Sequence, residues 1–291
     1  MYGDPVPERL SKSLWSSVGV SALALVAAVV VAMAMLQYYA PATGASPGRL
    51  IDTSSASVPS PPPSATPSAA VTPEPSTTPA PLTGLALAHS ILSAPSGASV
   101  LVYGDGSGDA TNEWVADWAR DHLATNATVT YNAWDRISGR YAAPIRYGTT
   151  GRSIKLWNAS VRSPDMALEP ARVAKAWQAA DLVMLSYGHR RTPSTITAQM
   201  DAVLTAIRAK NPTVPIVVML QNPDRADTAT IQQETTQKIQ AWSVAHGFAT
   251  VDIYSAFMAD PAPRNTLVLS DGSPSSQGSH LWAQTLAGEL K

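Results

Sequence analysis

The chain contains no cysteine. A disulfide framework and a thiolate metal site are therefore excluded, although the redox compartment stays open because a secreted protein can fold without disulfides. The formal net charge is only −1, and no run is rich in arginine or lysine, so the chain lacks the positive surface that nucleic acids require. Its five histidines are scattered without paired spacing. We expect no metal site, no cofactor and no nucleic-acid partner.

Charged residues are also missing from residues 13–48, and within that stretch Val18 to Leu36 is almost wholly apolar. Nineteen residues at about 1.5 Å each span roughly 29 Å, which is close to the hydrocarbon thickness of a bilayer. Aromatic residues flank the run, as is typical of the membrane interface. The sequence predicts a transmembrane signal-anchor helix at residues 14–40 and a membrane partnership through this one helix.

The positive charges around the apolar run indicate its orientation. Arg9 and Lys12 precede it, and the next positive charge is Arg49. This asymmetry predicts a cytoplasmic N-terminus at residues 1–13 and an extracytoplasmic C-terminal part in the cell membrane. The alternative is a signal peptide cleaved near Ala42 or Ala45, which would give a secreted protein.

Proline is concentrated in residues 41–82, which hold eleven of the 24 prolines together with many serines, threonines and alanines. Such a composition offers too little large apolar surface to form a core. We expect a disordered, extended Pro/Ser/Thr-rich linker that holds the following domain away from the membrane.

From residue 83 to residue 291, short apolar runs alternate with amphipathic stretches. This pattern predicts a three-layer α/β/α sandwich with a parallel sheet, because near-continuous apolar strands between helices are typical of a sheet that is covered on both faces. The expected strands are 99–103, 128–131, 154–157, 182–187, 216–220 and 249–253. The expected helices are 111–124, 168–179, 194–210, 228–246 and 277–290.

Chemistry in such a fold is placed on the loops after strand ends. Four segments occupy such positions: Gly-Asp-Gly-Ser-Gly at 104–108, Trp-Asn-Ala-Ser-Val-Arg-Ser at 157–163, Tyr-Gly-His-Arg-Arg at 187–191, and Ser-Asp-Gly-Ser-Pro at 270–274. We expect these loops to form one site.

Together the four segments resemble the blocks of the SGNH, or GDSL-type, hydrolase family, over residues 97–291. The resemblance implies a flavodoxin-like SGNH hydrolase fold and carboxylic-ester hydrolysis, often removal of acetyl groups from polysaccharides or lipids. In that family a serine attacks the carbonyl, a histidine acts as base and an aspartate orients it, while a glycine and an asparagine stabilise the oxyanion. Positions that keep the pattern are Gly104, Asp105, Asn158, Gly188 and Asp271.

The four residues that name the family are replaced. Gly106 occupies the serine position, Ser163 the glycine position and Arg190 the asparagine position, and Ser273 precedes Pro274 where the histidine is expected. A serine hydroxyl needs a base within hydrogen-bond reach, so these replacements predict lost or impaired catalysis.

Three functions follow from this comparison. The first is a catalytically impaired esterase-like domain that binds an envelope polysaccharide or ester through the residues around the old site, namely Asp105, Gly106, Asn158, Ser163, Gly188 and Arg190. The second is an active esterase or polysaccharide deacetylase that uses Ser107 as nucleophile with Asp271, and with His280 or His189 as the base. The third is a structural or partner-binding ectodomain.

Overall fold

The computed structural model describes residues 82–162, 165–189, 191–225 and 229–290. The predicted transmembrane segment at 14–40 lies outside the described residues, as does the predicted linker apart from its last residue. No helix within the described part of the chain combines the length and the apolar character that a membrane crossing needs.

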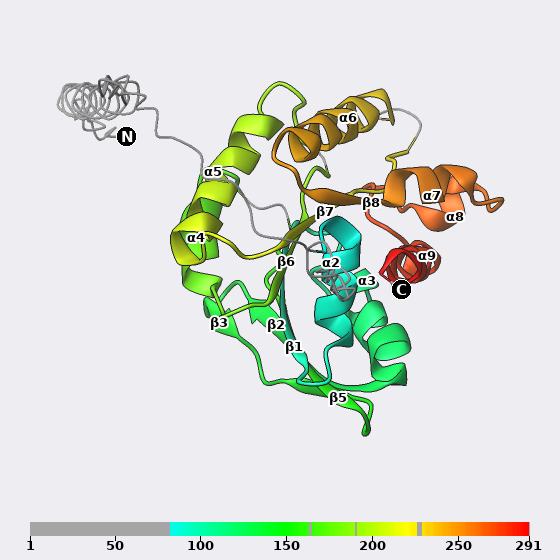
Figure 1. Ribbon diagram of the computed structural model, residues 1–291. Coiled ribbons are helices and arrows are strands. Elements are labelled where there is room, and N and C mark those ends of the chain that lie inside the picture. Colours follow the sequence, from blue (N-terminus) through cyan, green and yellow to red (C-terminus); the bar gives the residue numbers. More distant parts are fainter. Residues whose placement is uncertain (1–81, 163–164, 190, 226–228, 291) are drawn as a thin grey trace, which may run out of the picture. The chain divides into compact units, whose positions relative to one another are not determined.

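A mostly parallel sheet forms the centre of the domain (Figure 1). Its strands follow the order β3-β2-β5-β1-β6-β7-β8, and β4 pairs with β2. The six strands expected from the sequence are all present, whereas β3 and β4 were not predicted and pair antiparallel to β2, so the sheet is not wholly parallel. The bounds are β1 Ala98–Gly104, β2 Ala127–Asp135, β3 Arg140–Tyr141, β4 Ile145–Tyr147, β5 Arg152–Asn158, β6 Leu182–Ser186, β7 Ile216–Leu220 and β8 Ala249–Asp252.

Helices connect the strands near the expected places. The expected helix at 111–124 is instead divided into an α-helical turn, a π-helical turn and a 3-10 turn. Three helices (α2, α7 and α8) were not predicted. The bounds are α2 Gly84–Ser93, α3 Trp114–Asp117, η1 Trp118–His122, η2 Leu123–Thr125, α4 Glu169–Ala176, α5 Ile196–Lys210, α6 Ala229–Ala245, α7 Ile253–Ala259, α8 Arg264–Leu267 and α9 Ser276–Glu289.

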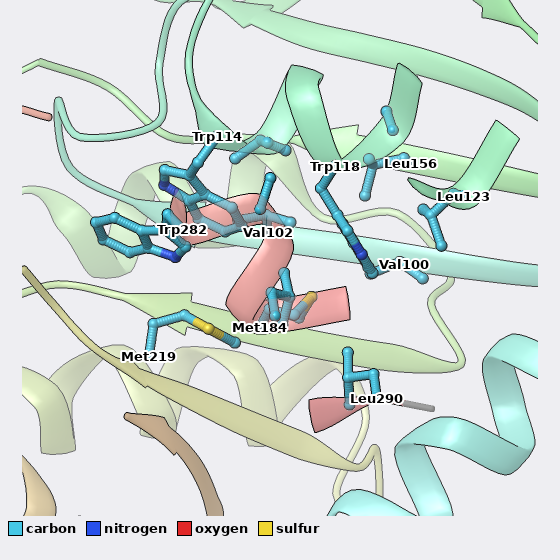
Figure 2. Close-up of a cluster of buried hydrophobic side chains, with 14 of the residues drawn as sticks. Val100, Val102, Trp114, Trp118, Leu123, Leu156, Met184, Met219, Trp282 and Leu290 are labelled. Carbon is cyan, nitrogen blue, oxygen red and sulfur yellow. The ribbon is translucent and has the colours of Figure 1, made fainter. Parts of the chain in front are cut away.

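Two hydrophobic cores lie on opposite faces of the sheet, because successive side chains of a strand point in opposite directions. Val100 and Val102 of β1 belong to the core that contains Trp114 and Trp282, whose rings stack with centroids 5.1 Å apart (Figure 2). The alternate β1 residues, Leu101 and Tyr103, belong to the core built with α4, α5 and α6. Helices therefore cover both faces, and the three-layer prediction is confirmed.

Parallel pairing brings the carboxyl ends of β1, β6 and β7 to one edge of the sheet. The backbone N–H of Asp105 donates to the Ser186 carbonyl at 3.1 Å, so the loop after β1 lies against the end of β6. At Gly104 a Cβ atom would lie 2.9 Å from that same carbonyl oxygen, which explains the glycine at the end of β1. The loop after β1 is thus held against its neighbour at the position where the sequence predicts a site.

Candidate functional site

Asp105 ties together three segments at this edge. Its Oδ1 accepts hydrogen bonds from the backbone N–H of Ser107 at 3.2 Å and from Gln221 Nε2 at 3.0 Å. Its Oδ2 accepts from the backbone N–H of His189 at 3.0 Å, and the residue is only 2% exposed. Because the carboxylate accepts from donors of its own turn, of the residue after β7 and of the loop after β6, it holds these segments together.

Ser107 points into the protein. Its side chain is fully buried, with 0% exposure, and Gln221 Nε2 lies 3.2 Å from its Oγ. The same Nε2 lies 2.7 Å from the Ser186 carbonyl oxygen, so the amide connects the β1 turn to the end of β6. The Ser107 hydroxyl is therefore part of the supporting structure beneath the loops.

Gly106 lies under Arg162. A Cβ atom at Gly106 would be 2.9 Å from the Arg162 Cα and 3.2 Å from its Cβ and Cγ. Real Cβ atoms are essentially never closer than 3.0 Å to another heavy atom, so a side chain here would displace the Arg162 backbone. The absence of a side chain at position 106 allows the arginine stem to cross the turn.

A cavity of about 240 Å³ opens above this turn. It receives residues from the loops after β1, β5 and β6 and from the loop before α9, which are the four loops that the sequence predicts to meet. The lining residues are Asp105, Gly106, Arg162, His189, Arg191, Asp271 and Ser273.

His189 is the imidazole of this cavity, and it is 7% exposed. Its Nε2 lies 3.0 Å from the backbone carbonyl oxygen of Asp271. A carbonyl oxygen only accepts, so Nε2 carries the hydrogen of this contact, and Nδ1 is the other nitrogen of the ring. This Nδ1 is buried and has no hydrogen-bond partner among the described residues.

Asp271 is the acidic group on the opposite side. Burial raises its pKa, but the hydrogen bonds from Ser273 and the nearby Arg162 and His189 outweigh that effect, so the pKa lies below its ordinary value. The Arg162 Nη1 lies 3.8 Å from the Asp271 Oδ2. The carboxylate is therefore ionised at neutral pH and balances part of the positive charge on the cavity wall.

No protein-family model and no curated protein matches the sequence. Among solved structures, LAE5, an alpha/beta hydrolase enzyme from the metagenome of Lake Arreo, Spain, is 14% identical and has a TM-score of 0.50, with 67% of this chain and 96% of that chain covered. The lipase/acylhydrolase from Enterococcus faecalis is 16% identical with a TM-score of 0.49, and the match covers 66% of this chain and 94% of that chain. A lipolytic G-D-S-L protein from Veillonella parvula is 13% identical with a TM-score of 0.46, over 65% and 96% of the two chains.

The domain therefore shares its overall fold with the alpha/beta hydrolase enzyme LAE5. At these identities the likeness concerns the fold alone, so the chemistry of the domain has to be argued from its own residues.

Two further positions that match the SGNH/GDSL pattern serve the scaffold. Asn158 Nδ2 donates to the Gly108 carbonyl at 2.7 Å and to the Tyr131 hydroxyl at 2.9 Å. Gly188 has a φ of +136°, and a Cβ atom there would lie 2.7 Å from Ile239 Cδ1. Both residues shape the loops around the cavity, although neither lines it.

The structure does not bring His280 to Ser107. His280 lies on the exposed side of α9, and its ring centroid is 6.4 Å from that of His122, which lines a different cavity. The cause is the position of His280 within a regular helix, which directs the side chain away from the strand ends. Ser163 and Arg190 lie outside the described residues.

Sequence reasoning gave no site role to Arg162 or Gln221, and it offered His189 only as an alternative to His280 as the base for Ser107. Gln221 directly follows β7, and His189 follows the end of β6, so position after a strand was the available signal. Nothing in the sequence signals that Arg162 covers the β1 turn. Among the described residues, no group of three or more His, Asp or Glu side chains is arranged to hold a metal ion.

Proposed function

We propose that this SGNH/GDSL-type domain has lost Ser-His ester hydrolysis and that its cavity binds a small ligand from the cell envelope, a glycan or ester group. The observation that carries the proposal is the geometry of the β1 turn. Ser107 is buried against Gln221, and position 106, which faces the cavity, has no side chain.

Hydrolysis by a serine requires a base within about 2.6 to 3.2 Å of the hydroxyl. At 3.2 Å from the Ser107 Oγ lies an amide nitrogen, which donates hydrogen bonds and takes no proton. Losing one member of such a catalytic unit costs several orders of magnitude in rate. This argues against Ser107 as the nucleophile.

Ligand binding is supported by what the cavity retains. It is concave, lies at the carboxyl edge of the sheet and is lined by the His189 ring and by charged side chains of both signs. Sites of this kind are the usual binding positions in open α/β sheets.

The direct test uses the full chain purified in a mild non-ionic detergent. It is incubated with an activated acetyl ester and, separately, with a fluorophosphonate probe, alongside a Ser107→Ala variant and an exposed-serine control, Ser153→Ala. We expect turnover no faster than the buffer reaction and no labelling for any of the three proteins. Turnover that disappears only in Ser107→Ala would contradict the proposal.

A second candidate is ester hydrolysis without Ser107, because His189 and Ser273 line the same cavity. It predicts turnover that persists in Ser107→Ala and disappears in both His189→Gln and Ser273→Ala. The same assay therefore separates the two candidates.

For the N-terminal part, we propose that residues 14–40 anchor the chain in the membrane and that the domain lies outside the cytoplasm. The apolar run and the positive charges that precede it support this proposal. Cell fractionation should recover the full-length chain with membranes, and protease added to spheroplasts should digest the domain. A chain released into the medium at lower mass would indicate signal cleavage instead.

A further inference from the structure

The hairpin that joins β2 to β3 presents the most exposed large hydrophobic side chain of the described residues. Ile137 lies in the turn of this hairpin and is 95% exposed. Two exposed arginines, Arg136 and Arg140, flank it. We infer that the hairpin is a membrane-contact element, which places Ile137 in the interface of a bilayer and the two arginines against anionic lipid headgroups. The inference goes beyond the proposed function, because the hairpin lies outside the cavity.

Local hydrogen bonds hold Ile137 in its exposed position. The Asp135 Oδ1 accepts a hydrogen bond from the backbone N–H of Ile137 at 2.8 Å, and the Asp135 carbonyl accepts one from the backbone N–H of Gly139 at 2.8 Å. Gly139 has a φ of +62°, a conformation that glycine adopts without steric cost. The turn is therefore well defined, and the exposure of Ile137 is a property of the folded hairpin.

Positive charge gathers around this turn, although the chain as a whole has a net charge of −1. Lys175 of α4 joins the two arginines, because a Cβ atom at Gly139 would lie 2.5 Å from the Lys175 Nζ. Within the part of the chain that the structure describes, none of these three cations forms an ion pair. The only acidic residue between positions 135 and 147 is Asp135. The turn therefore keeps a net positive charge.

A second apolar segment follows the turn. The residues between β3 and β4, Ala142, Ala143 and Pro144, are exposed, and Ile145 at the start of β4 is 40% exposed. Apolar and cationic side chains thus share one exposed segment at the end of the sheet where β3 lies (Figure 1). A bilayer surface rewards both kinds of side chain, because apolar area is buried and anionic lipids attract the cations. A soluble polyanion would engage the cations but would leave Ile137 in water.

The hairpin also lies at the edge of the sheet where the cavity is found. It continues from the carboxyl end of β2, which runs parallel to β5 with Ala133 opposite Asn158. The chain after Asn158 leads to Arg162, which lines the cavity. A bilayer that the hairpin contacts would therefore lie at this edge of the sheet, close to the cavity.

The absence of cysteine allows a test with a single label. Ile137→Cys in the full chain is coupled to the environment-sensitive fluorophore NBD. The chain is reconstituted in nanodiscs of phosphatidylcholine alone or of equal parts of phosphatidylcholine and phosphatidylglycerol. We expect blue-shifted emission, and severalfold stronger quenching by a nitroxide-labelled phosphatidylcholine, in the anionic nanodiscs only.

A second labelled position provides the control. Val244 is 72% exposed on α6, which packs beside β7 and β8 at the other end of the sheet. The same fluorophore on Val244→Cys should give the same emission and the same weak quenching in both kinds of nanodisc.

Charge variants of the Ile137→Cys chain test the role of the arginines. Each cation near an anionic bilayer contributes about fivefold to the docking equilibrium, so Arg136→Gln combined with Arg140→Gln should weaken docking about 25-fold and remove the blue shift. Lys210→Gln combined with Lys238→Gln removes the same charge from α5 and α6 and should leave the emission unchanged. Urea denaturation of each labelled chain verifies that it is folded.

The remaining outcomes would overturn the inference. Emission at position 137 that is the same in the two nanodiscs, whether shifted in both or in neither, would contradict a contact with anionic lipid. A shift that survives the double arginine substitution would contradict the role of these cations. An equal shift produced by soluble polyglutamate in the neutral nanodiscs would assign the hairpin to a polyanion instead of a bilayer. Whether residues 14–40 anchor the chain is judged separately by cell fractionation.

Discussion

The stem of Arg162 crosses Gly106 so closely that a Cβ at position 106 would lie 2.9 Å from the arginine Cα. Gly106 occupies the position that the SGNH/GDSL resemblance assigns to the nucleophile, and Arg162 supplies a cation to the cavity. The two residues lie in direct contact. The glycine at position 106 and the arginine above it are therefore coupled in space.

Placing a serine at position 106 should destabilise the domain without creating ester hydrolysis. The new Cβ has to displace backbone atoms of Arg162, and overpacking of this kind costs about 1 to 3 kcal/mol. We expect Gly106→Ser to lower the free energy of unfolding by that amount, measured by urea denaturation, with ester turnover at the level of the buffer.

A control glycine lies on α9. A Cβ at Gly288 meets no atom within 4 Å, so Gly288→Ser should leave stability unchanged or slightly improved. If both glycine variants unfold at the same urea concentration, the crowding between Gly106 and Arg162 has no energetic consequence and the coupling proposed for these residues is wrong.

Gln221 should stabilise the site strongly, because its Nε2 lies within hydrogen-bond distance of Asp105, Ser107 and Ser186. Gln221→Leu removes that donor and leaves buried acceptors unsatisfied, at a cost of about 2 to 4 kcal/mol in the free energy of unfolding. The exposed Gln240 of α6 provides the control, and Gln240→Leu should change stability by less than about 0.5 kcal/mol. Equal effects of the two substitutions in chemical denaturation would show that the amide is not a support.

Sequence patterns were sufficient to predict the central layers. The strand at 216–220 was placed at its observed bounds, because five consecutive apolar residues between polar segments form a strand buried on both faces. The antiparallel strands β3 and β4 were not predicted, because two and three residues are too few to show an alternation of apolar and polar side chains.

The site was predicted less completely than the fold. Position after a strand indicated Asp105, whereas Asp271 lies between α8 and α9 and not after a strand, although both residues line one cavity. The direction of a side chain depends on tertiary packing, however, and sequence position alone does not reveal it. Packing is the reason why Ser107 points inward to Gln221 and why His280 faces solvent. Arg162 reaches the cavity through contacts between two loops that are remote in sequence, and no local pattern encodes such contacts.

Removal of one partner from the buried pair Glu169 and Arg172 should destabilise the domain strongly. Arg172 Nη2 binds the Glu169 carboxylate and also lies 2.9 Å from the Tyr187 hydroxyl, which in turn donates to Glu169. Arg172→Met leaves a buried carboxylate without its cation, which costs about 3 to 5 kcal/mol. Urea denaturation should show this loss.

Two further variants distinguish a charge effect from a packing effect at that pair. Adding Glu169→Gln to Arg172→Met removes the unpaired charge and should recover most of the lost stability. Lys238→Met breaks the exposed Lys238 to Glu234 pair, at 3.3 Å, and should cost less than about 1 kcal/mol. If the double variant is no more stable than Arg172→Met, lost packing and not the unpaired charge explains the effect.

Glu113 should make the stability of the domain depend on pH below neutrality. Burial raises its pKa from an ordinary 4.5 to about 7, and the hydrogen bond from the backbone N–H of Ala110, at 2.7 Å, only partly offsets this. At a pH between 4.5 and about 7 the Glu113 carboxyl binds its proton more tightly in the folded state than in the unfolded state. The protonated carboxyl therefore contributes fully to stability below about pH 4.5, and this contribution is lost as the pH rises to about 7. The loss amounts to about 3 kcal/mol, because each pKa unit corresponds to about 1.4 kcal/mol. Glu113→Gln keeps an acceptor for the Ala110 N–H and carries no charge. We therefore expect the free energy of unfolding of this variant to rise relative to that of the native chain as the pH increases. Urea denaturation at a series of pH values from 4.5 to 8 measures this difference. The exposed Glu289→Gln should follow the native profile, and a Glu113→Gln profile parallel to both would show that Glu113 is not held protonated by burial.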